Sequence, residues 1–357
     1  MKKTTFGMLA VLTAGCCLSA AAQDADSLDF EFAVQQVEMN YAGYPSRAAG
    51  ADRSEYEVLK TRLRQDVRER NRPGYEAVGE LFGWFGDYHL RAGIYADPYM
   101  RPGSDYGAMQ YDPERVACKV DGQTFLIRVP SFDLDRTEME WITRAVGSYR
   151  KSGCEDLIVD IRGNGGGRDQ SYQPLLELLY DHPGAVDGVE IRVSADNTAF
   201  VRNAIAGGGL DWLRPVADSM AVGNRDFVPF SFENEPIRFD SVALRPRNAA
   251  VLIDGNVASS GEQFVLDVQA CSARTTIYGR DNTLGCLDFS NCMPVNLPGS
   301  KITLSVPVTR SMRLPDRGID RTGIAPDVRI TLPLPEELTD NVDAWVRWVA
   351  EELKTRN

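Results

Sequence analysis

The chain has only two histidines, His89 and His182, among its 357 residues. A zinc site built from three histidines is therefore excluded, and any imidazole chemistry has to use one of this pair. The sequence also lacks a Cys-x-x-Cys spacing, so its cysteines do not indicate a zinc site or a dithiol redox site. On these grounds we expect neither a metal nor a cofactor.

Positive charge and long apolar runs are also scarce. Acidic residues outnumber basic ones by 51 to 39, which gives a net charge of -12. Nucleic-acid binding depends on clustered Lys and Arg, so we expect no nucleic-acid partner. After the N-terminal region no segment approaches 18 consecutive apolar residues, and no membrane-spanning helix is predicted there. Hydrophobic residues at 43% and charged residues at 25% are typical of a globular chain.

The N-terminus has the pattern of an export signal. Lys2 and Lys3 precede the apolar stretch 6–18, and Ala20-Ala21-Ala22 offers small residues for cleavage. We expect residues 1–22 to be a signal peptide and the protein to be exported, either periplasmic or associated with the outer membrane of a bacterium. A retained N-terminal anchor is one alternative. A lipid anchor at Cys16 is another, because the preceding Thr-Ala-Gly resembles a bacterial lipobox.

Five cysteines remain after such a cleavage, an odd number that leaves at least one thiol unpaired in an exported protein. Cys286 and Cys292 flank a short loop and form the pair that we expect to bridge. The other three fit the pattern of small buried apolar residues, namely Cys118, Cys154 and Cys271.

The pattern of apolar residues divides the mature chain in two. Between residues 28 and 90 the spacing is near 3.6, which predicts helices, and residues 91–114 lack a period. We assign residues 23–114 to an N-terminal helical region with an irregular loop. Residues 115–357 alternate strands and helices, which predicts an α/β core with mainly parallel pairing. The strands and helices expected there are 124–129, 138–151, 157–161, 249–253, 261–271, 275–278, 302–306 and 340–354.

Two stretches follow buried strands and carry residues suited to chemistry. The cluster Gly163–Gly167 can turn its backbone amides toward an anion, although it also fits a plain tight turn. Neither a dinucleotide-binding nor a P-loop spacing is present there. Ser259 and Ser260 stand between a strand and a helix, a position that suits a nucleophile beside free amides and equally an ordinary helix N-cap.

The two histidines have different contexts. His89 closes the helical region in the sequence Gly-Asp-Tyr-His, where a structural histidine is the common alternative to a catalytic one. His182 lies in Asp-His-Pro-Gly, which predicts a solvated turn.

Together these stretches resemble the tail-specific, or C-terminal processing, serine peptidase family, which also contains the tricorn core and the interphotoreceptor retinoid-binding protein. Five elements occur in the family's order: Asn-Tyr-Ala-Gly at 40–43, Asp-Tyr-His at 87–89, the glycine block at 160–167, Ser-x-x-Glu at 259–262 and Gly-Ile-Ala-Pro-Asp at 323–327. The resemblance implies a Clp-protease/crotonase-like α/β core with an N-terminal helical domain. The stretch between His89 and Cys118 is too short for the PDZ module that many relatives carry.

The resemblance also implies roles for individual residues. The family's glutamate follows the nucleophile by three positions, which makes Ser259 the nucleophile ahead of Glu262. Ser260 would then donate its backbone N–H to the oxyanion, and Gly165 or Gly166 would supply the second donor.

The activating group is implied by comparing branches of the family. In one branch a lysine follows Thr-x-Gly, but here Cys286 stands at that position. The tricorn-like branch uses the histidine of Asp-x-His and an acid just before Gly-x-x-Pro-Asp, which correspond to His89 and Asp320. A neutral imidazole can take the serine proton, and a carboxylate can orient it.

The sequence therefore predicts an exported serine endopeptidase that cleaves peptides or unfolded polypeptide tails through an acyl-enzyme. Ser259, His89 and Asp320 are its expected triad. The alternative is a catalytically inactive family member that binds an apolar ligand or a peptide. The sequence leaves the physiological substrate and the oligomeric state open.

Overall fold

The computed structural model describes residues 9–93, 114–231 and 235–356. The chain forms two compact units, and it passes between them several times. Unit 1 comprises Met1–Met100, Glu190–Phe230 and Phe289–Arg310. Unit 2 comprises Arg101–Val189, Ser231–Asp288 and Ser311–Asn357.

Unit 1 opens with four helices. They are α1 (Leu9–Asn40), α2 (Tyr44–Arg47), α3 (Gly50–Arg68) and α4 (Gly74–Phe85). Their apolar faces are buried against one another through aromatic and aliphatic side chains that include Phe30, Tyr56, Leu63, Leu81 and Phe82. The helices expected in this region are confirmed, because 3.6-residue spacing gives each one a single apolar face.

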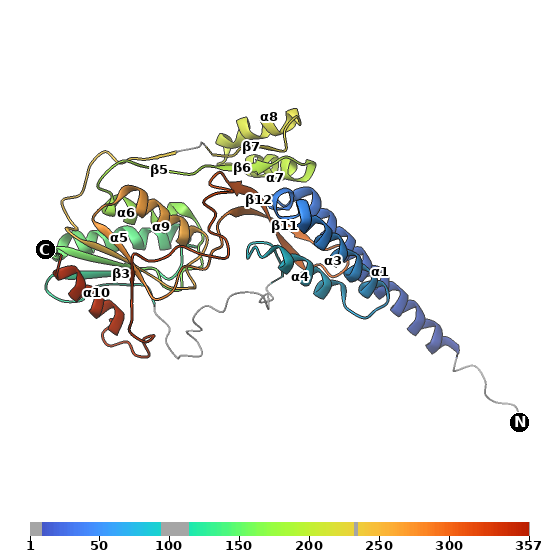
Figure 1. Ribbon diagram of the computed structural model, residues 1–357, viewed down its shortest axis with the longest axis horizontal. Coiled ribbons are helices and arrows are strands. Elements are labelled where there is room, and N and C mark those ends of the chain that lie inside the picture. The colour runs from blue at the N-terminus through green and yellow to red at the C-terminus, as the bar shows by residue number, and fades with distance from the viewer. Residues whose placement is uncertain (1–8, 94–113, 232–234, 357) are drawn as a thin grey trace, which may run out of the picture. The chain divides into compact units, whose positions relative to one another are not determined.

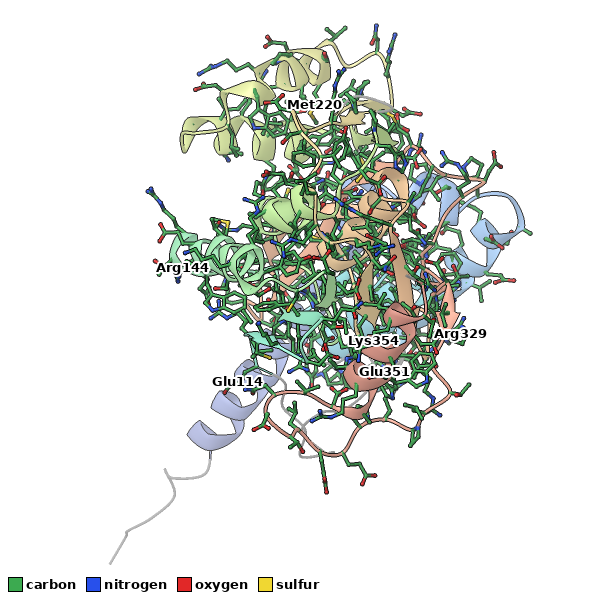
Figure 2. All side chains as sticks on the ribbon, turned by 90° about the vertical axis from the view of Figure 1, so that its left-hand side faces the viewer. Glu114, Arg144, Met220, Arg329, Glu351 and Lys354 are labelled. Atoms are coloured by element: carbon green, nitrogen blue, oxygen red, sulfur yellow. The ribbon has the colours of Figure 1, made fainter. Side chains whose placement is uncertain are left out.

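A sheet completes unit 1. Strands β1 (Arg91–Ala92), β12 (Thr303–Ser311), β6 (Val189–Arg192) and β7 (Phe227–Pro229) lie in that order, and β11 (Phe289–Asn296) pairs with β12 in antiparallel register. Helices α7 (Ala195–Ala206) and α8 (Arg214–Val222), joined by the short η1 (Asp211–Leu213), share an apolar cluster with this sheet. Met220, which Figure 2 labels on α8, belongs to that cluster.

Unit 2 is built on a six-stranded sheet. Its order is β13 (Val328–Arg329), β10 (Thr275–Gly279), β9 (Ala249–Ile253), β4 (Asp156–Asp160), β3 (Thr124–Arg128) and β2 (Val116–Lys119). All neighbouring pairs are parallel except β2 with β3. A separate two-stranded ribbon joins β5 (Gly184–Val186) to β8 (Glu235–Ile237).

Helices cover both faces of this sheet (Figure 1). On one face, Leu157 and Val159 share an apolar cluster with helices α5 (Arg136–Ser152), α6 (Asp169–Leu179) and α9 (Ser260–Cys271). On the opposite face, Ile158 shares a second apolar cluster with α10 (Ala344–Lys354). Alternate residues of a strand point to opposite faces, so the continuous apolar strands are those of a sheet buried on both sides. The outer side of α10 carries the charged residues Glu351 and Lys354 (Figure 2), and Nζ of Lys354 lies 2.7 Å from Oε1 of Glu351. The expected α/β core with N-terminal helices is confirmed.

Several sequence expectations fall at the edges of the described residues. Part of the expected signal peptide (residues 1–8) and most of the expected loop (94–113) lie outside them, so the export signal and the domain boundary at 114/115 stay predictions. Among the described helices, none has the length and apolarity needed to cross a membrane.

The expected disulfide is absent from the described residues. Cys286 and Cys292 are both thiols. Cys292 lies within β11, with its Sγ 3.9 Å from the carbonyl oxygen of His89. The backbone N–H and C=O of Cys286 are held by Glu262 and Ser259. A short separation in sequence does not by itself bring two Cβ atoms to bonding distance, because each backbone has its own anchors.

Candidate active site

The glycine cluster forms a loop directly after β4, and the buried Asn164 holds its shape. The Asn164 side chain donates to the carbonyl oxygen of Val129 at 2.9 Å and accepts the N–H of Gly166 at 3.0 Å. The Asn164 main-chain carbonyl accepts the N–H of Ala258 at 3.0 Å. One buried residue therefore ties the glycine loop to Val129, just after β3, on one side and to the segment before Ser259 on the other.

Ser259 occupies a sharp turn between β9 and α9. Its φ of 53° and ψ of -123° lie in a region that non-glycine residues rarely adopt. Strands β4 and β9 are parallel neighbours, so the loops that follow them meet at one edge of the sheet. A Cβ atom on Gly166, where φ is 102°, would lie 2.6 Å from the Cβ of Ser259 and 3.0 Å from the backbone nitrogen of Ser260. The loop can approach the serines this closely only because Gly166 has no side chain.

The two serines have different environments. Ser260 is buried, and its hydroxyl donates to the carbonyl oxygen of Gly167 at 3.0 Å. Ser259 is partly exposed, and its side chain makes no N-cap hydrogen bond to α9. The N-cap alternative for Ser259 is therefore wrong, and Ser259 has the hydroxyl that a substrate can reach.

The backbone N–H groups of the two loops that meet here differ in their hydrogen bonding. Within the part of the chain that the structure describes, the N–H groups of Gly165 and Ser260 make no hydrogen bond, whereas the N–H of Gly166 is bonded to Asn164. Ser260 is also the first residue of α9, where the helix dipole is positive. Of the two glycines considered from the sequence, Gly165 is the one with an N–H available for an oxyanion.

Glu262 fixes the segment on the other side of Ser259. Its fully buried carboxylate accepts the N–H of Gly285 at 2.7 Å, the N–H of Cys286 at 2.8 Å and the hydroxyl of Thr283 at 2.5 Å. The carbonyl of Cys286 in turn accepts the N–H of Ser259 at 3.1 Å. Burial raises the pKa of Glu262 above its ordinary value, although the donors around it act in the opposite direction.

Exchange of Glu262 for glutamine is expected to destabilise unit 2. Both oxygens of Glu262 accept hydrogen bonds from donors, so an amide NH₂ placed there opposes an N–H or O–H and leaves a buried donor unsatisfied. Such a loss costs about 1–3 kcal/mol of unfolding free energy, which urea denaturation measures. Glu140→Gln, on the exposed side of α5, is the matched control and should change stability by less than about 0.5 kcal/mol. Equal stability of Glu262→Gln and wild type would contradict this role.

Asp320 and Asp288 hold each other's backbone. Asp320 Oδ1 accepts the N–H groups of Leu287 and Asp288 at 2.9 and 2.8 Å. Asp288 Oδ2 accepts those of Ile319 and Asp320, each at 2.7 Å, and Asp288 Oδ1 is 2.7 Å from Nε of Arg313. We call this arrangement, in which each carboxylate binds two N–H groups of the opposite segment, the reciprocal aspartate clamp.

His89 belongs to unit 1, where it follows the end of α4 at Gly86. Its backbone N–H donates to Oδ1 of the buried Asp87 at 2.9 Å. Its ring Nδ1 is 2.6 Å from the carbonyl oxygen of Phe289, the first residue of β11. A carbonyl can only accept, so Nδ1 carries the proton, and in the neutral ring Nε2 then has the lone pair.

The structure thus brings together Ser259, Ser260, Gly165 and Gly166 in one loop pair of unit 2. Asp320 lies in the same unit, within the clamp. His89 lies in unit 1, so the approach of His89 to Ser259 stays a prediction. His182 is an exposed loop residue, as expected, and its Nδ1 contacts Asp181. Sequence reasoning missed Asp288 and the Phe289 carbonyl.

Comparison with known proteins identifies the family of the chain. A model of peptidase family S41 matches residues 123–330, more than half of the chain. No curated protein sequence matches the chain.

Several solved structures share its fold. The mature CPAF structure with lactacystin aligns with a TM-score of 0.63 at 12% identity, over 94% of this chain and 97% of that one. A candidate peptidase from Parabacteroides merdae aligns with a TM-score of 0.56 at 15% identity, over 92% and 96% of the two chains. A lipoprotein from Streptococcus agalactiae aligns with a TM-score of 0.52 at 14% identity, over 93% and 97%.

Proposed function

We propose that Ser259 is the nucleophile of this chain, which belongs to peptidase family S41 and is a serine-type peptidase that acts on polypeptides. His89 is the general base in this proposal, and Asp320 is the acid that orients it. The enzyme is an endopeptidase, and its substrates are peptides or unfolded polypeptide tails.

The reaction proceeds through an acyl-enzyme. The Oγ atom of Ser259 attacks the scissile carbonyl carbon while Nε2 of His89 takes the serine proton. The N–H groups of Ser260 and Gly165 donate hydrogen bonds to the oxyanion of the tetrahedral intermediate. Gly166, which has no side chain, lets the glycine loop lie close to the turn at Ser259. His89 then gives its proton to the leaving amine, and a water molecule, activated by the same imidazole, hydrolyses the acyl-enzyme.

The observation that carries the proposal is the strained turn at Ser259. A backbone in a sparsely populated region costs of order 1–3 kcal/mol and persists where the surroundings enforce it. Here Asn164, Glu262 and Gly166 enforce it from three sides. The result is a partly exposed hydroxyl next to the N–H of Ser260 and against the glycine loop, an arrangement that a protein without turnover does not need.

We also propose that the enzyme is exported. The sequence pattern of residues 1–22 supports a signal peptide, and a periplasmic or outer-membrane-associated location follows from it. Lipid attachment at Cys16 is the version of this proposal in which the protein stays at the membrane surface. Electrophoretic mobility and mass of the protein after export distinguish the two forms.

A fluorophosphonate probe tests the catalytic proposal, because it reacts only with an activated serine. We expect the purified wild type to be labelled, with the adduct on Ser259 by peptide mass spectrometry. Ser259→Ala and His89→Ala should abolish labelling, whereas Ser148→Ala, on the exposed side of α5, should retain it. A folded wild type that is not labelled would contradict the peptidase mechanism and favour a family member that only binds peptides or apolar ligands.

A further inference from the structure

The proposed base has a hydrogen-bond partner that is part of the main chain. In serine peptidase chemistry the imidazole works in one tautomer, with the proton on Nδ1 and the lone pair on Nε2. The Phe289 carbonyl lies 2.6 Å from Nδ1 of His89 and accepts its proton. This geometry lies entirely within unit 1.

The position of that carbonyl is itself well fixed. Phe289 is buried and pairs with Arg310 in the β11–β12 ladder. The guanidinium of Arg47 stands 4.8 Å from the centre of its ring, and the ring of Tyr41 is 5.6 Å away. Strand pairing and ring packing together leave the carbonyl little freedom to turn away from His89.

The residues just before Phe289 are held by the reciprocal aspartate clamp. Asp320 receives the N–H groups of Leu287 and Asp288 on a single oxygen, Oδ1. The chain continues from Asp288 directly into Phe289, so the clamp holds the two residues that lead into β11. Asp288 is almost fully buried and pairs with Arg313, which anchors the clamp in unit 2.

We propose that the main-chain carbonyl of Phe289 fixes the tautomer of His89, and that Asp320 orients the base through the backbone of residues 287–289. This inference rests on the proposed role of His89 as base. In it Asp320 is a positioning residue, and its two backbone hydrogen bonds matter more than its negative charge. Asp288 has the same role from the opposite side of the clamp.

Asparagine and alanine at position 320 separate the contribution of the two backbone hydrogen bonds from that of the negative charge. Asparagine keeps an amide oxygen that can accept from Leu287 and Asp288, whereas alanine keeps no acceptor. We expect Asp320→Asn to lower kcat by about tenfold or less and Asp320→Ala to lower it by about 100-fold, the effect of a small misplacement of a reacting group. If the charge of Asp320 set the tautomer, the asparagine variant would lose roughly 10⁴-fold, which would overturn the proposal.

The tautomer can be read without any activity. Nitrogen-15 NMR of histidine-labelled protein, recorded above the ordinary histidine pKa of about 6.5, distinguishes a protonated from an unprotonated ring nitrogen. His182→Gln leaves His89 as the one labelled histidine. We expect the Nδ1–H tautomer in this protein and in the same protein carrying Asp320→Asn. The Nε2–H tautomer in either would overturn the proposal, even if the enzyme is active.

A change in the carbonyl itself is the most direct test. Replacing Ser290 by its α-hydroxy acid converts the preceding carbonyl, that of Phe289, into an ester carbonyl, which is a weaker acceptor. We expect a weaker Nδ1–H signal and a fall in kcat of about fivefold, since one neutral hydrogen bond is worth about 1 kcal/mol. The same exchange at Met293, further along β11, is the control for the lost N–H. Equal kcat and equal tautomer signals in the two esters would overturn the proposal.

These readouts separate the inference from the proposed function. A protein with the Nδ1–H tautomer that fails to react with the fluorophosphonate probe would contradict the peptidase mechanism alone. A reactive protein with the Nε2–H tautomer would contradict the role of Phe289 alone.

Discussion

Alanine at position 166 is expected to lower kcat/KM by about 10³-fold while leaving the protein folded. The added Cβ would lie 2.6 Å from the Cβ of Ser259, 2.9 Å from the carbonyl oxygen of Ala258 and 3.0 Å from the nitrogen of Ser260. Two of these three atoms are backbone, so they cannot be moved by a change of rotamer. The turn that carries Ser259 has to shift away from the glycine loop.

Such a shift disturbs two catalytic features at once. It moves the nucleophile, where a displacement of about 1 Å can cost 10²-fold, and it moves the N–H of Ser260 away from the oxyanion, where loss of one donor costs about 10²–10³-fold. The positive φ of Gly166 adds backbone strain for any L-residue. The fold should survive, because overpacking of this kind typically costs about 1–3 kcal/mol.

The measurement is kcat/KM on an unfolded polypeptide substrate, with circular dichroism to verify folding. Gly147→Ala is the matched control, because its added Cβ meets nothing within 4 Å in α5. That control should keep full activity and gain up to about 1 kcal/mol of stability through helix propensity. Activity of Gly166→Ala within tenfold of wild type would show that Gly166 is not needed at the site.

The core of unit 2 could be predicted from sequence because its elements carry strong local signals. The strands β4 and β9 carry continuous apolar runs, and the neighbouring helices, α5 before β4 and α9 after β9, have apolar residues at helical spacing. The sequence pattern predicts no separate elements between residues 169 and 237. The strands β5, β7 and β8 of this segment have only three residues each, too few to show a period of two. Their placement depends on partners distant in the sequence.

The candidate site divides in the same way. Ser259 and the glycine loop were found because each follows a buried strand with residues of unusual backbone freedom. The partner of His89 was not found, because a main-chain carbonyl at Phe289 has no signature in the sequence. The clamp was missed as well. Asp288 has no patterned neighbours and is buried by contacts more than 20 residues away.

The largest expected loss of stability is at Asp343, which lies within the helix expected at 340–354 but precedes the observed α10. Asp343 precedes α10 and is buried with Asp160, Arg128 and Arg162 in a network whose side chains are at most 3% exposed. Asp160 lies 2.8 Å from Arg128 and 2.7 Å from Arg162, and Asp343 lies 2.6 Å from Arg162. Two positive and two negative charges therefore balance beneath the glycine loop.

Removal of Asp343 leaves two guanidinium groups facing one carboxylate in a buried site. Breaking a buried ion pair from one side costs about 3–5 kcal/mol. Asp343 also caps α10, since its Oδ1 accepts the N–H groups of Trp345 and Val346 at 2.9 and 3.0 Å, and a lost cap adds about 1 kcal/mol. We expect Asp343→Ala to lower the unfolding free energy at pH 7 by about 4–6 kcal/mol.

Asp343→Asn separates the two contributions, because its amide oxygen can still cap α10 while the charge is gone. It should lose about 1 kcal/mol less than Asp343→Ala, as measured by urea denaturation with tryptophan fluorescence. Trp345 is a local reporter, with its ring centre 5.3 Å from the guanidinium of Arg162. A loss below about 1 kcal/mol for Asp343→Ala would show that the buried charges do not depend on this residue.

We expect the same network to affect the stability of the fold in acid. Burial alone would raise the pKa of Asp160, but Arg162 and Arg128 outweigh it and hold that pKa well below its usual range. A carboxylate with a depressed pKa in the folded state stabilises the fold at pH values above its unfolded value of about 3.9, and this contribution is lost as the pH falls below it. Removing the charge of Asp343 leaves the arginines with Asp160 as their remaining carboxylate in the network, so Asp343→Asn should unfold at a higher pH than wild type during acid titration. Coincident acid transitions of the two proteins would show that the charge balance beneath the glycine loop does not govern acid stability.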